Sequence, residues 1–260
     1  MRQPPQIRLL PDGRRLHLSD GPIDLIVEAF GAMDQVRAAY RSAGDRFVSV
    51  LDELCSELAL LRQPIEVNST LPTGCVARRM VLAVAPYAQR CFLTPLAAVA
   101  GSVAEEILAA MTSAAKLSRA YVNNGGDIAF HLAPGEQFVA GVIERPDRPS
   151  LFGTATLHHD QPSRGIATSG WRGRSFSLGI ADAATVLADT ASRADAGATV
   201  IANAVNLPQH SFILREPARN LAPDSDLGDL AVTRDVPQLT APEVHQALAA
   251  GARVAGELLA

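Results

Sequence analysis

Three short segments of this sequence carry residue types that suit a phosphorylated ligand and a metal ion. They are Asn-Asn-Gly-Gly-Asp at 123–127, Thr-Ser-Gly at 168–170, and the pair Asp195 and Thr199. Each segment alone is a weak signal. Together, in this order, they favour a site that binds a phosphorylated cofactor and a divalent cation.

The glycine pair follows a predicted strand. Gly125 and Gly126 can adopt φ angles that other residues avoid, and their successive N–H groups can bind phosphate oxygens. The alternative is an ordinary Gly-Gly hairpin turn. Asn124, which precedes the pair, is a candidate cofactor-binding residue. Asp127, which follows it, can accept a hydrogen bond from a ribose or a flavin ring N–H, or can simply belong to the turn.

Thr168, Ser169 and Gly170 end another predicted strand, where hydroxyl groups and a glycine suit binding to phosphate or carbonyl groups. A serine nucleophile is an alternative, because His158 and His159 are near in sequence. The segment lacks the Gly-x-Ser-x-Gly pattern of a nucleophile elbow.

A Trp-Arg-Gly-Arg turn follows directly at 171–174. Arg172 and Arg174 suit an anionic phosphate, and Trp171 suits stacking on an aromatic ring. The alternatives are solvated arginines and a half-buried core tryptophan.

Asp195 and Thr199 share one face of a predicted helix because they are four residues apart. A carboxylate and a hydroxyl supply the hard oxygen ligands that Mg²⁺ prefers. The alternative is an aspartate that interacts with the helix dipole and a threonine that bonds back to its own helix.

Composition limits the class of protein. Apolar residues make up 48% of the 260 residues and charged residues 19%, which predicts a folded globular chain. The net charge of −4 argues against nucleic acid and anionic membranes as partners. Cys55, Cys75 and Cys91 are odd in number and widely spaced, so we expect buried free thiols in a reducing compartment. With no signal peptide or membrane-spanning run expected, these features favour the cytoplasm.

The hydrophobic pattern predicts an α+β fold of antiparallel sheets and packed helices. Three strands are expected within residues 7–30, with a Pro-Asp-Gly turn at 11–13. Helical spacing covers 32–61, with a break expected near Gly44. A loop at 69–74, a helix at 76–85, a strand at 90–93 and a helix at 97–111, rich in small residues, follow. The small residues of that last helix indicate close packing against another element. The alternative is that they leave room for a ligand.

The second half predicts short strands and then helices. Strands are expected at 120–122, 128–132, 138–143, 154–158, 166–168, 176–178 and 184–187, and helices at 191–205 and 244–259. A strand followed by a small-residue helix occurs at 91–111 and again at 185–205, which suggests a duplicated α+β unit. We expect a single domain over residues 1–260.

These motifs, in this order, resemble the ApbE superfamily, known for FAD-dependent flavin transferases. The segments at 95–101, 122–128, 166–170 and 194–199 are similar to its helix-opening glycine segment and to its Val-Asn-x-Gly-Gly-Asp, Thr-Ser-Gly and Ala-Asp-Ala-x-x-Thr elements. The resemblance is to a poorly characterised ApbE-like branch. It implies an FAD pocket lined by Gly125, Gly126 and Asp127, with Thr168, Ser169 and Gly170 on the flavin side, and Mg²⁺ held by Asp195 and Thr199.

The sequence departs from the superfamily pattern at two places, and these differences leave more than one functional hypothesis open. Ala100 stands where the superfamily has a lysine, and 172–179 replaces a segment that contains histidine. One hypothesis is a Mg²⁺-dependent transfer of FMN from FAD to an acceptor protein. Another is a non-transferring relative that binds a flavin or another phosphorylated small molecule, or acts as an accessory metabolic protein, and a third is a purely structural role. The small-residue helices also allow a homodimer.

Overall fold

We describe a computed structural model of the chain, which covers residues 3–66, 69–143 and 151–259. The chain divides into two compact units. The first comprises residues 1–140, 155–167 and 187–195, and the second comprises residues 141–154, 168–186 and 196–260. Each is described by itself, and a single domain over 1–260 stays a prediction.

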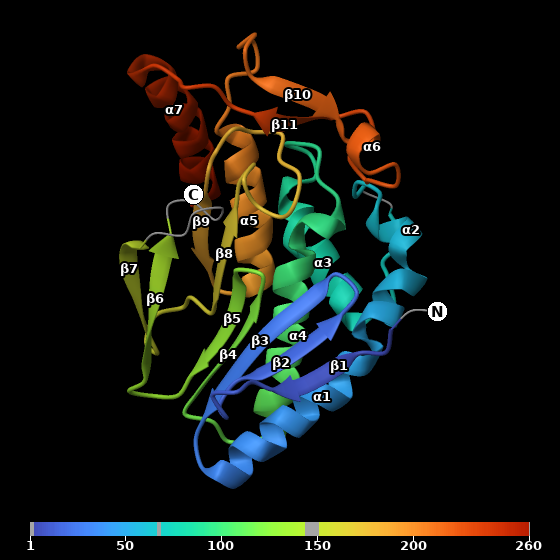
Figure 1. Cartoon of the computed structure of the whole chain (residues 1–260), viewed down its shortest axis with the longest axis vertical. Helices are drawn as coiled ribbons and strands as arrows, with labels where there is room; N and C mark the ends of the chain where they lie inside the picture. Colours follow the sequence, from blue (N-terminus) through green and yellow to red (C-terminus); the bar gives the residue numbers. More distant parts are fainter. Residues whose placement is uncertain (1–2, 67–68, 144–150, 260) are drawn as a thin grey trace. The chain divides into compact units, whose positions relative to one another are not determined.

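A seven-stranded sheet organises the fold, in the order β1-β2-β3-β4-β5-β8-β9 (Figure 1). The pairs from β1 to β8 are antiparallel. Two further strands, β6 and β7, form a separate ribbon. The bounds are β1 Gln6–Leu9, β2 Leu16–Asp20, β3 Ile23–Phe30, β4 Arg119–Asn124, β5 Asp127–Leu132, β6 Gln137–Ile143, β7 Leu151–His158, β8 Gly165–Ser169 and β9 Ala184–Ala188. The predicted α+β class with antiparallel sheets is confirmed.

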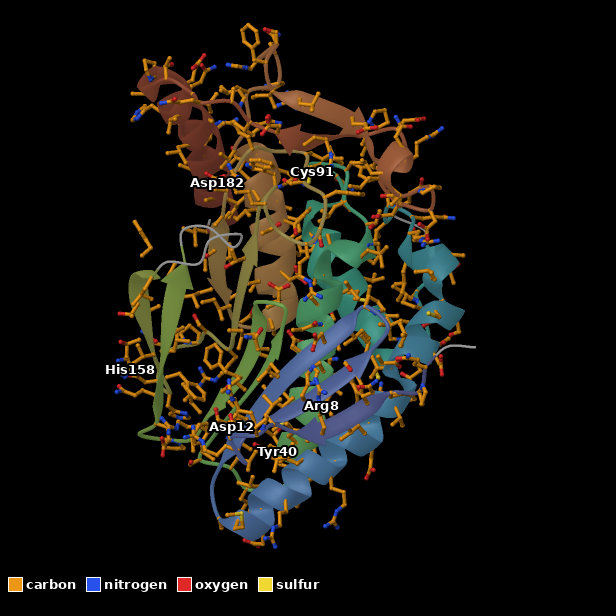
Figure 2. The ribbon with its side chains drawn as sticks, in the orientation of Figure 1. Arg8, Asp12, Tyr40, Cys91, His158 and Asp182 are labelled. Carbon is orange, nitrogen blue, oxygen red and sulfur yellow. The ribbon has the colours of Figure 1, made fainter. Side chains whose placement is uncertain are left out.

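The first strands follow from alternation. In β2, Leu16, Leu18 and Asp20 are buried, and His17 and Ser19 between them are partly exposed. The predicted turn before β2 is present, with Gly13 at φ 68°. The Asp12 carboxylate accepts the N–H groups of Arg14 and Arg15 and so fixes this turn. Figure 2 labels Asp12 there, together with Tyr40 on the neighbouring helix.

Helices α1 and α4 cover one face of strands β2 to β5 (Figure 1). The first unit contains α1 Met33–Ser56, α2 Leu58–Leu61, α3 Cys75–Val84 and α4 Val99–Ala114, with short 3-10 turns at Ala85–Tyr87 and Pro95–Ala98. The largest fully buried side chains of this core include Phe47, Met80, Ile107 and Met111. A stripe of apolar residues on each helix therefore seals one side of the sheet.

Three predicted elements are wrong. The break expected near Gly44 is absent: α1 continues through Gly44, and the Ile7 side chain packs 3.3 Å from where a Cβ would stand. Residues 90–93 and 176–178 form turns and irregular backbone instead of strands. The predicted duplication required a strand before α4. Because no strand forms there, the first of the two proposed repeats lacks its strand.

Helix α4 with the turn before it, Pro95–Ala114, is long and apolar enough to cross a membrane by length and composition. This stretch is longer than any apolar run expected from the sequence. It packs against α1, α3, β4 and β5, and Val103, Ala104 and Ile107 are fully buried. It is a core helix of the first unit.

The second unit contains two strands that the sequence pattern did not predict, β10 Leu214–Pro217 and β11 Ala231–Asp235, which pair antiparallel. A short helix α6 Ala218–Leu221 and the long α7 Ala241–Leu258 complete it. Thr240 and Glu243 form a capping box at the start of α7. Its core contains Ile180, Ala202, Val205, Leu207, Ile213 and Ala247.

Ala191, the first residue of α5 Ala191–Ala204, lies against two glycines of the first unit. A Cβ at Gly101 would stand 2.3 Å from the Ala191 carbonyl oxygen, and a Cβ at Gly165 would stand 2.3 Å from the Ala191 Cα. No side chain fits at either glycine without movement of the backbone. The small residues of α4 therefore serve close packing, at least at Gly101.

We expect Gly101→Ala to destabilise the protein by about 1–3 kcal/mol or more, because the new methyl group overlaps backbone atoms. Gly153→Ala is the matched control, since nothing lies within 4 Å of a Cβ there. It should change stability by less than about 0.5 kcal/mol. Urea unfolding measures both, and equal midpoints would contradict the packing argument.

Candidate functional site

The buried carboxylate of Asp195 is the centre of the candidate site. Asp195 lies in the second turn of α5 with 9% of its surface exposed. Its Oδ2 accepts the N–H of Gly101 at 3.0 Å, and the N–H of Ala100 also donates to this carboxylate. Both amides belong to the first turn of α4, whose N–H groups have no partners within their own helix. The start of α4 thus binds the carboxylate with free amides and the positive end of its dipole.

Asp127, at the start of β5, lies close enough to repel Asp195 electrostatically. Burial raises the pKa of Asp195 well above its usual range, and the charge of Asp127 raises it further, while the two α4 amides oppose the shift. Two carboxylates this close cannot both be ionised cheaply. The protonated form of Asp195 is therefore favoured unless a cation lies beside it.

The Gly-Gly turn closes the β4–β5 hairpin. Gly125 and Gly126 have φ of 67° and 117°, and Asn124 pairs with Asp127 across the turn. The N–H of Gly126 donates to Asn123 Oδ1 at 2.8 Å. An asparagine of the turn therefore already accepts the Gly126 N–H, and binding of phosphate by these glycines stays a prediction. The hairpin serves the site by setting the place of Asp127.

Asn124 ties this hairpin to α4. Its Nδ2 donates to the Ala100 carbonyl oxygen at 3.2 Å, and its side chain is buried. The sequence analysis expected Asn124 to contact a cofactor. In the structure it braces the same first turn of α4 whose amides bind Asp195.

Glu105 of α4 holds the beginning of α5. Its Oε1 accepts the Ser192 N–H at 2.7 Å and the Ser192 Oγ–H at 2.9 Å. Its Oε2 lies 2.8 Å from Nε of Arg79, on α3. Glu105 thus supplies a cap to a helix that begins 86 residues later in the sequence.

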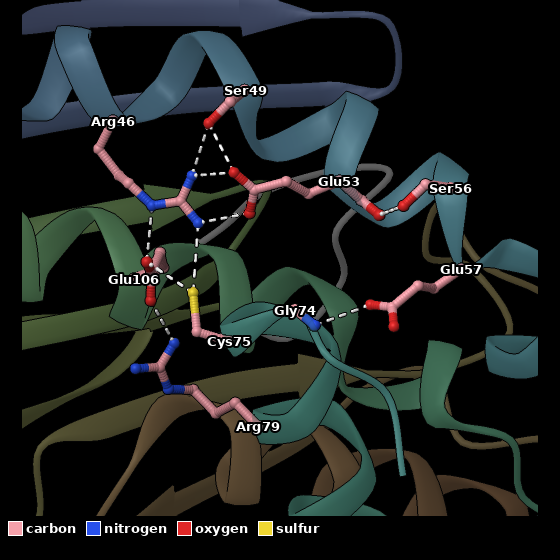
Figure 3. A network of polar contacts seen from close by, with 9 residues as sticks. All are labelled: Arg46, Ser49, Glu53, Ser56, Glu57, Gly74, Cys75, Arg79 and Glu106. Carbon is pink, nitrogen blue, oxygen red and sulfur yellow. Dashed lines mark hydrogen bonds and ion pairs between the residues drawn. The ribbon is translucent and has the colours of Figure 1, made fainter. Parts of the chain in front are cut away.

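The Arg79 guanidinium extends this contact into a network of polar side chains on α1, α3 and α4 (Figure 3). Arg79 also binds Glu106, and Glu106 binds Nε of Arg46 at 2.7 Å. Arg46 binds Glu53 in turn. Although burial opposes it, hydrogen bonds from Arg79, Arg46 and Cys75 lower the pKa of Glu106 to about 2.

Cys75 joins this network, with its Sγ 3.2 Å from Glu106 Oε1. All three cysteines are free, as predicted. They are exposed, so the expected burial is wrong. Cys75 begins α3 and the other two lie near helix or turn ends, where the backbone reaches the surface.

The remaining predicted site residues belong to the second unit. The Thr168 hydroxyl pairs with that of Thr185 at 2.8 Å. Gly170 packs against residues 181 and 182, where a Cβ would lie 2.5 Å from the Asp182 carbonyl oxygen. Ser169 ends β8. Thr199 lies one turn beyond Asp195 on α5. Thr168 and Gly170 therefore have structural contacts of their own.

Arg172 does not project freely toward a ligand. Its Nε binds Asp182 at 2.5 Å, and its guanidinium lies 4.2 Å from the centre of the Trp171 ring. Arg172 and Asp182 border a cavity of about 250 Å³. Figure 2 labels Asp182. The other walls of the cavity are apolar and include Val205, Val236 and Leu248. This cavity alone is smaller than the 300–1,000 Å³ of typical ligand pockets.

Across the described ranges, no cluster of three or more His, Cys, Asp or Glu side chains has the arrangement of a metal site. Two carboxylates remain, Asp127 and Asp195. They fit Mg²⁺, because this ion usually keeps several waters and takes one or two carboxylates plus ligand phosphates. They do not fit zinc, which prefers cysteine and histidine.

A family model described as AbpE bacteria matches residues 7–260. The chain belongs to this family.

Its relatives include archaeal proteins named UPF0280. The chain is 36% identical over 146 residues to one from Methanococcoides burtonii, covering 56% of this chain and 57% of the relative. It is 34% identical over 164 residues to one from Methanopyrus kandleri, covering 63% and 61%. It is 42% identical over 117 residues to one from Methanothermobacter thermautotrophicus, covering 44% and 43%. The chain spans less than two thirds of these relatives' length, and their names state no activity.

Sequence reasoning named both aspartates but missed the groups that hold Asp195. Backbone amides such as those of Ala100 and Gly101 carry no side-chain signal. Glu105 was missed because an acidic residue within an alanine-rich helix is typical of a solvated face. Only the Pro95 start of this helix pointed to amides at its beginning.

We expect Asp195→Asn to change how stability depends on pH in metal-free protein. Because the folded-state pKa of Asp195 is raised, the folded protein keeps a proton that the unfolded chain loses above about pH 3.8. Wild-type stability should therefore fall as pH rises from that value toward the folded-state pKa. Asparagine cannot ionise, so the variant should lack this decline. Urea unfolding from pH 3 upward measures it, and parallel profiles would refute the burial of a proton.

Glu106→Gln should show the opposite pH dependence. The pKa of Glu106 is lowered from 4.5 to about 2, so its ionised form stabilises the fold above pH 4.5 and this contribution is lost as pH falls toward 2. The substitution should cost about 1–2 kcal/mol at pH 7, since solvent screens part of the network. Its cost should shrink on acidification. A cost that stays constant from pH 7 to pH 2 would count against the ion pairs.

Proposed function

We propose that this protein binds a divalent cation, Mg²⁺ in cells, at Asp127 and Asp195, and with it the phosphates of a nucleotide. The observation that supports the proposal is the pair of repelling carboxylates, one of them buried, beside the first turn of α4. A cation removes the repulsion, because it replaces the proton that the pair must otherwise hold.

The nucleotide we propose is a flavin nucleotide, FAD. The support is the order of motifs that resembles the ApbE superfamily. Thr199, one turn beyond Asp195, is the further oxygen ligand that the resemblance implies. The cofactor-binding roles of Gly125, Gly126, Thr168, Ser169, Gly170 and Arg172 stay predictions.

The reaction we propose is transfer of FMN from FAD to a hydroxyl group of an acceptor protein. The acceptor oxygen forms a bond to the phosphorus of the FMN half, the bond between the two phosphates breaks, and AMP leaves while the hydroxyl proton is released. A bound cation would neutralise the charge that grows on the phosphates. Asp127 and Asp195 would orient it, and the α4 amides would keep Asp195 in place.

A non-transferring flavin-binding relative is the second candidate. It is favoured by Ala100, which stands where the superfamily has a lysine, and by the Arg172–Asp182 ion pair in the segment that replaces the histidine element. The two candidates differ in one product. Purified protein incubated with FAD, Mg²⁺ and candidate acceptors should release AMP if it transfers FMN. Retention of unmodified FAD without AMP supports the second candidate.

Substitution tests the binding site itself. We expect Asp127→Asn and Asp195→Asn each to weaken Mg²⁺ binding at least tenfold, and to weaken FAD binding in the presence of Mg²⁺, because each removes a charged oxygen ligand. Titration calorimetry measures both.

Asp189→Asn is the matched control, because this aspartate precedes α5 and pairs with the exposed Arg193. It should bind Mg²⁺ and FAD like the wild type. A wild-type protein that takes up neither Mg²⁺ nor flavin would overturn the proposed function. Unchanged affinity in both site variants would place the ligand elsewhere.

A further inference from the structure

Helices α4 and α5 are joined by two contacts that lie one helical turn apart. Gly101 and Glu105 are four residues apart on α4, and Ser192 and Asp195 are three residues apart on α5. Each pair shares one face of its helix. The Gly101 amide binds Asp195, and the Glu105 carboxylate binds Ser192. Each helix therefore supplies one carboxylate that accepts a hydrogen bond from the backbone of the other helix.

The Glu105 contact is stronger than a side-chain hydrogen bond on a surface. Glu105 is only 15% exposed, and one of its oxygens accepts two hydrogen bonds from Ser192. Charge-assisted bonds to a carboxylate are about twice as strong as neutral ones. The residue before α5, Thr190, supplies a weaker cap, since its Oγ1 accepts the Arg193 N–H at 3.3 Å.

The network of charged side chains that ends at Glu105 also interacts with the start of α5. Glu53, Glu106 and Glu105 alternate with Arg46 and Arg79, so three carboxylates face two guanidiniums. One negative charge is left over. Glu105 contacts the positive end of the α5 dipole through Ser192, and this favourable interaction offsets part of that charge.

We propose that Glu105 is a positioning residue for the cation site: by capping α5 from α4, it fixes Asp195 against the Ala100 and Gly101 amides. Arg79 in turn orients Glu105. This inference rests on the proposed function in one respect, that the cation binds at Asp195. The position of Asp195 can be measured without any cation.

The experiment compares Glu105→Ala and Glu105→Gln with the wild type by two measurements. Amide hydrogen exchange at Ser192 and Gly101 reports the two contacts directly, in metal-free protein. Titration with Mn²⁺ alone reports the affinity of the site. Glu105→Ala should speed exchange at both amides and weaken Mn²⁺ binding about 10- to 100-fold, as loss of a residue that orients a metal ligand does. Glu105→Gln keeps an acceptor oxygen and should fold if alanine does not, with effects in the same direction but smaller.

Glu243→Ala is the matched control, because Glu243 accepts the N–H and Oγ–H of Thr240 at the start of α7 in the same way. It should speed exchange at Thr240 and leave Mn²⁺ affinity within twofold of the wild type. Unchanged exchange at Gly101 in both Glu105 variants would overturn the positioning role, whether or not the protein binds metal. Absence of Mn²⁺ binding in the wild type would instead overturn the proposed function, and exchange at Gly101 would still decide the role of Glu105.

Discussion

The candidate site depends on one constraint, the cost of keeping the Asp195 carboxylate in the interior. Burying an isolated carboxylate costs several kcal/mol even after the protein relaxes. Hydrogen bonds from Ala100 and Gly101 to a charged group each return about 1.5–3 kcal/mol, which roughly offsets that cost. These two hydrogen bonds do not offset the additional electrostatic repulsion from Asp127. The pair is therefore stable with a proton, or with a cation that serves both residues.

The surrounding elements maintain this balance through rigid contacts. Ala191 packs against Gly101 and Gly165 at distances that exclude any side chain, so the start of α5 cannot slide along α4. Asn124 holds the hairpin that presents Asp127 against the same turn of α4. Because the carboxylates sit at a helix and a strand end rather than on long loops, their separation is set by packed backbone.

The sequence predicted those parts whose signal is local. Alternation identified β2 and β3, and the Gly-Gly pair identified the β4–β5 turn. Asp127 and Asp195 were assigned to one site because their motifs resemble those of a known superfamily. No periodicity in the sequence relates two residues that are 68 positions apart. The helix break at Gly44 was wrong because the packing of Ile7 outweighed a local propensity. Strands β10 and β11 were missed because they are short and carry charged residues such as Arg215 and Arg234. Glu105 could not be found, because its role exists only once α4 and α5 meet.

The charge of the site also bears on the order in which a cation and a nucleotide would bind. The charge of Asp127 lies beside the buried Asp195, and the whole chain carries a net charge of −4. A phosphate group would be repelled from such a place. The α4 amides cannot attract it, because Asp195 already occupies them. Under the proposed function, a phosphorylated ligand would therefore gain attraction here through a cation, and metal binding would be a condition for nucleotide binding.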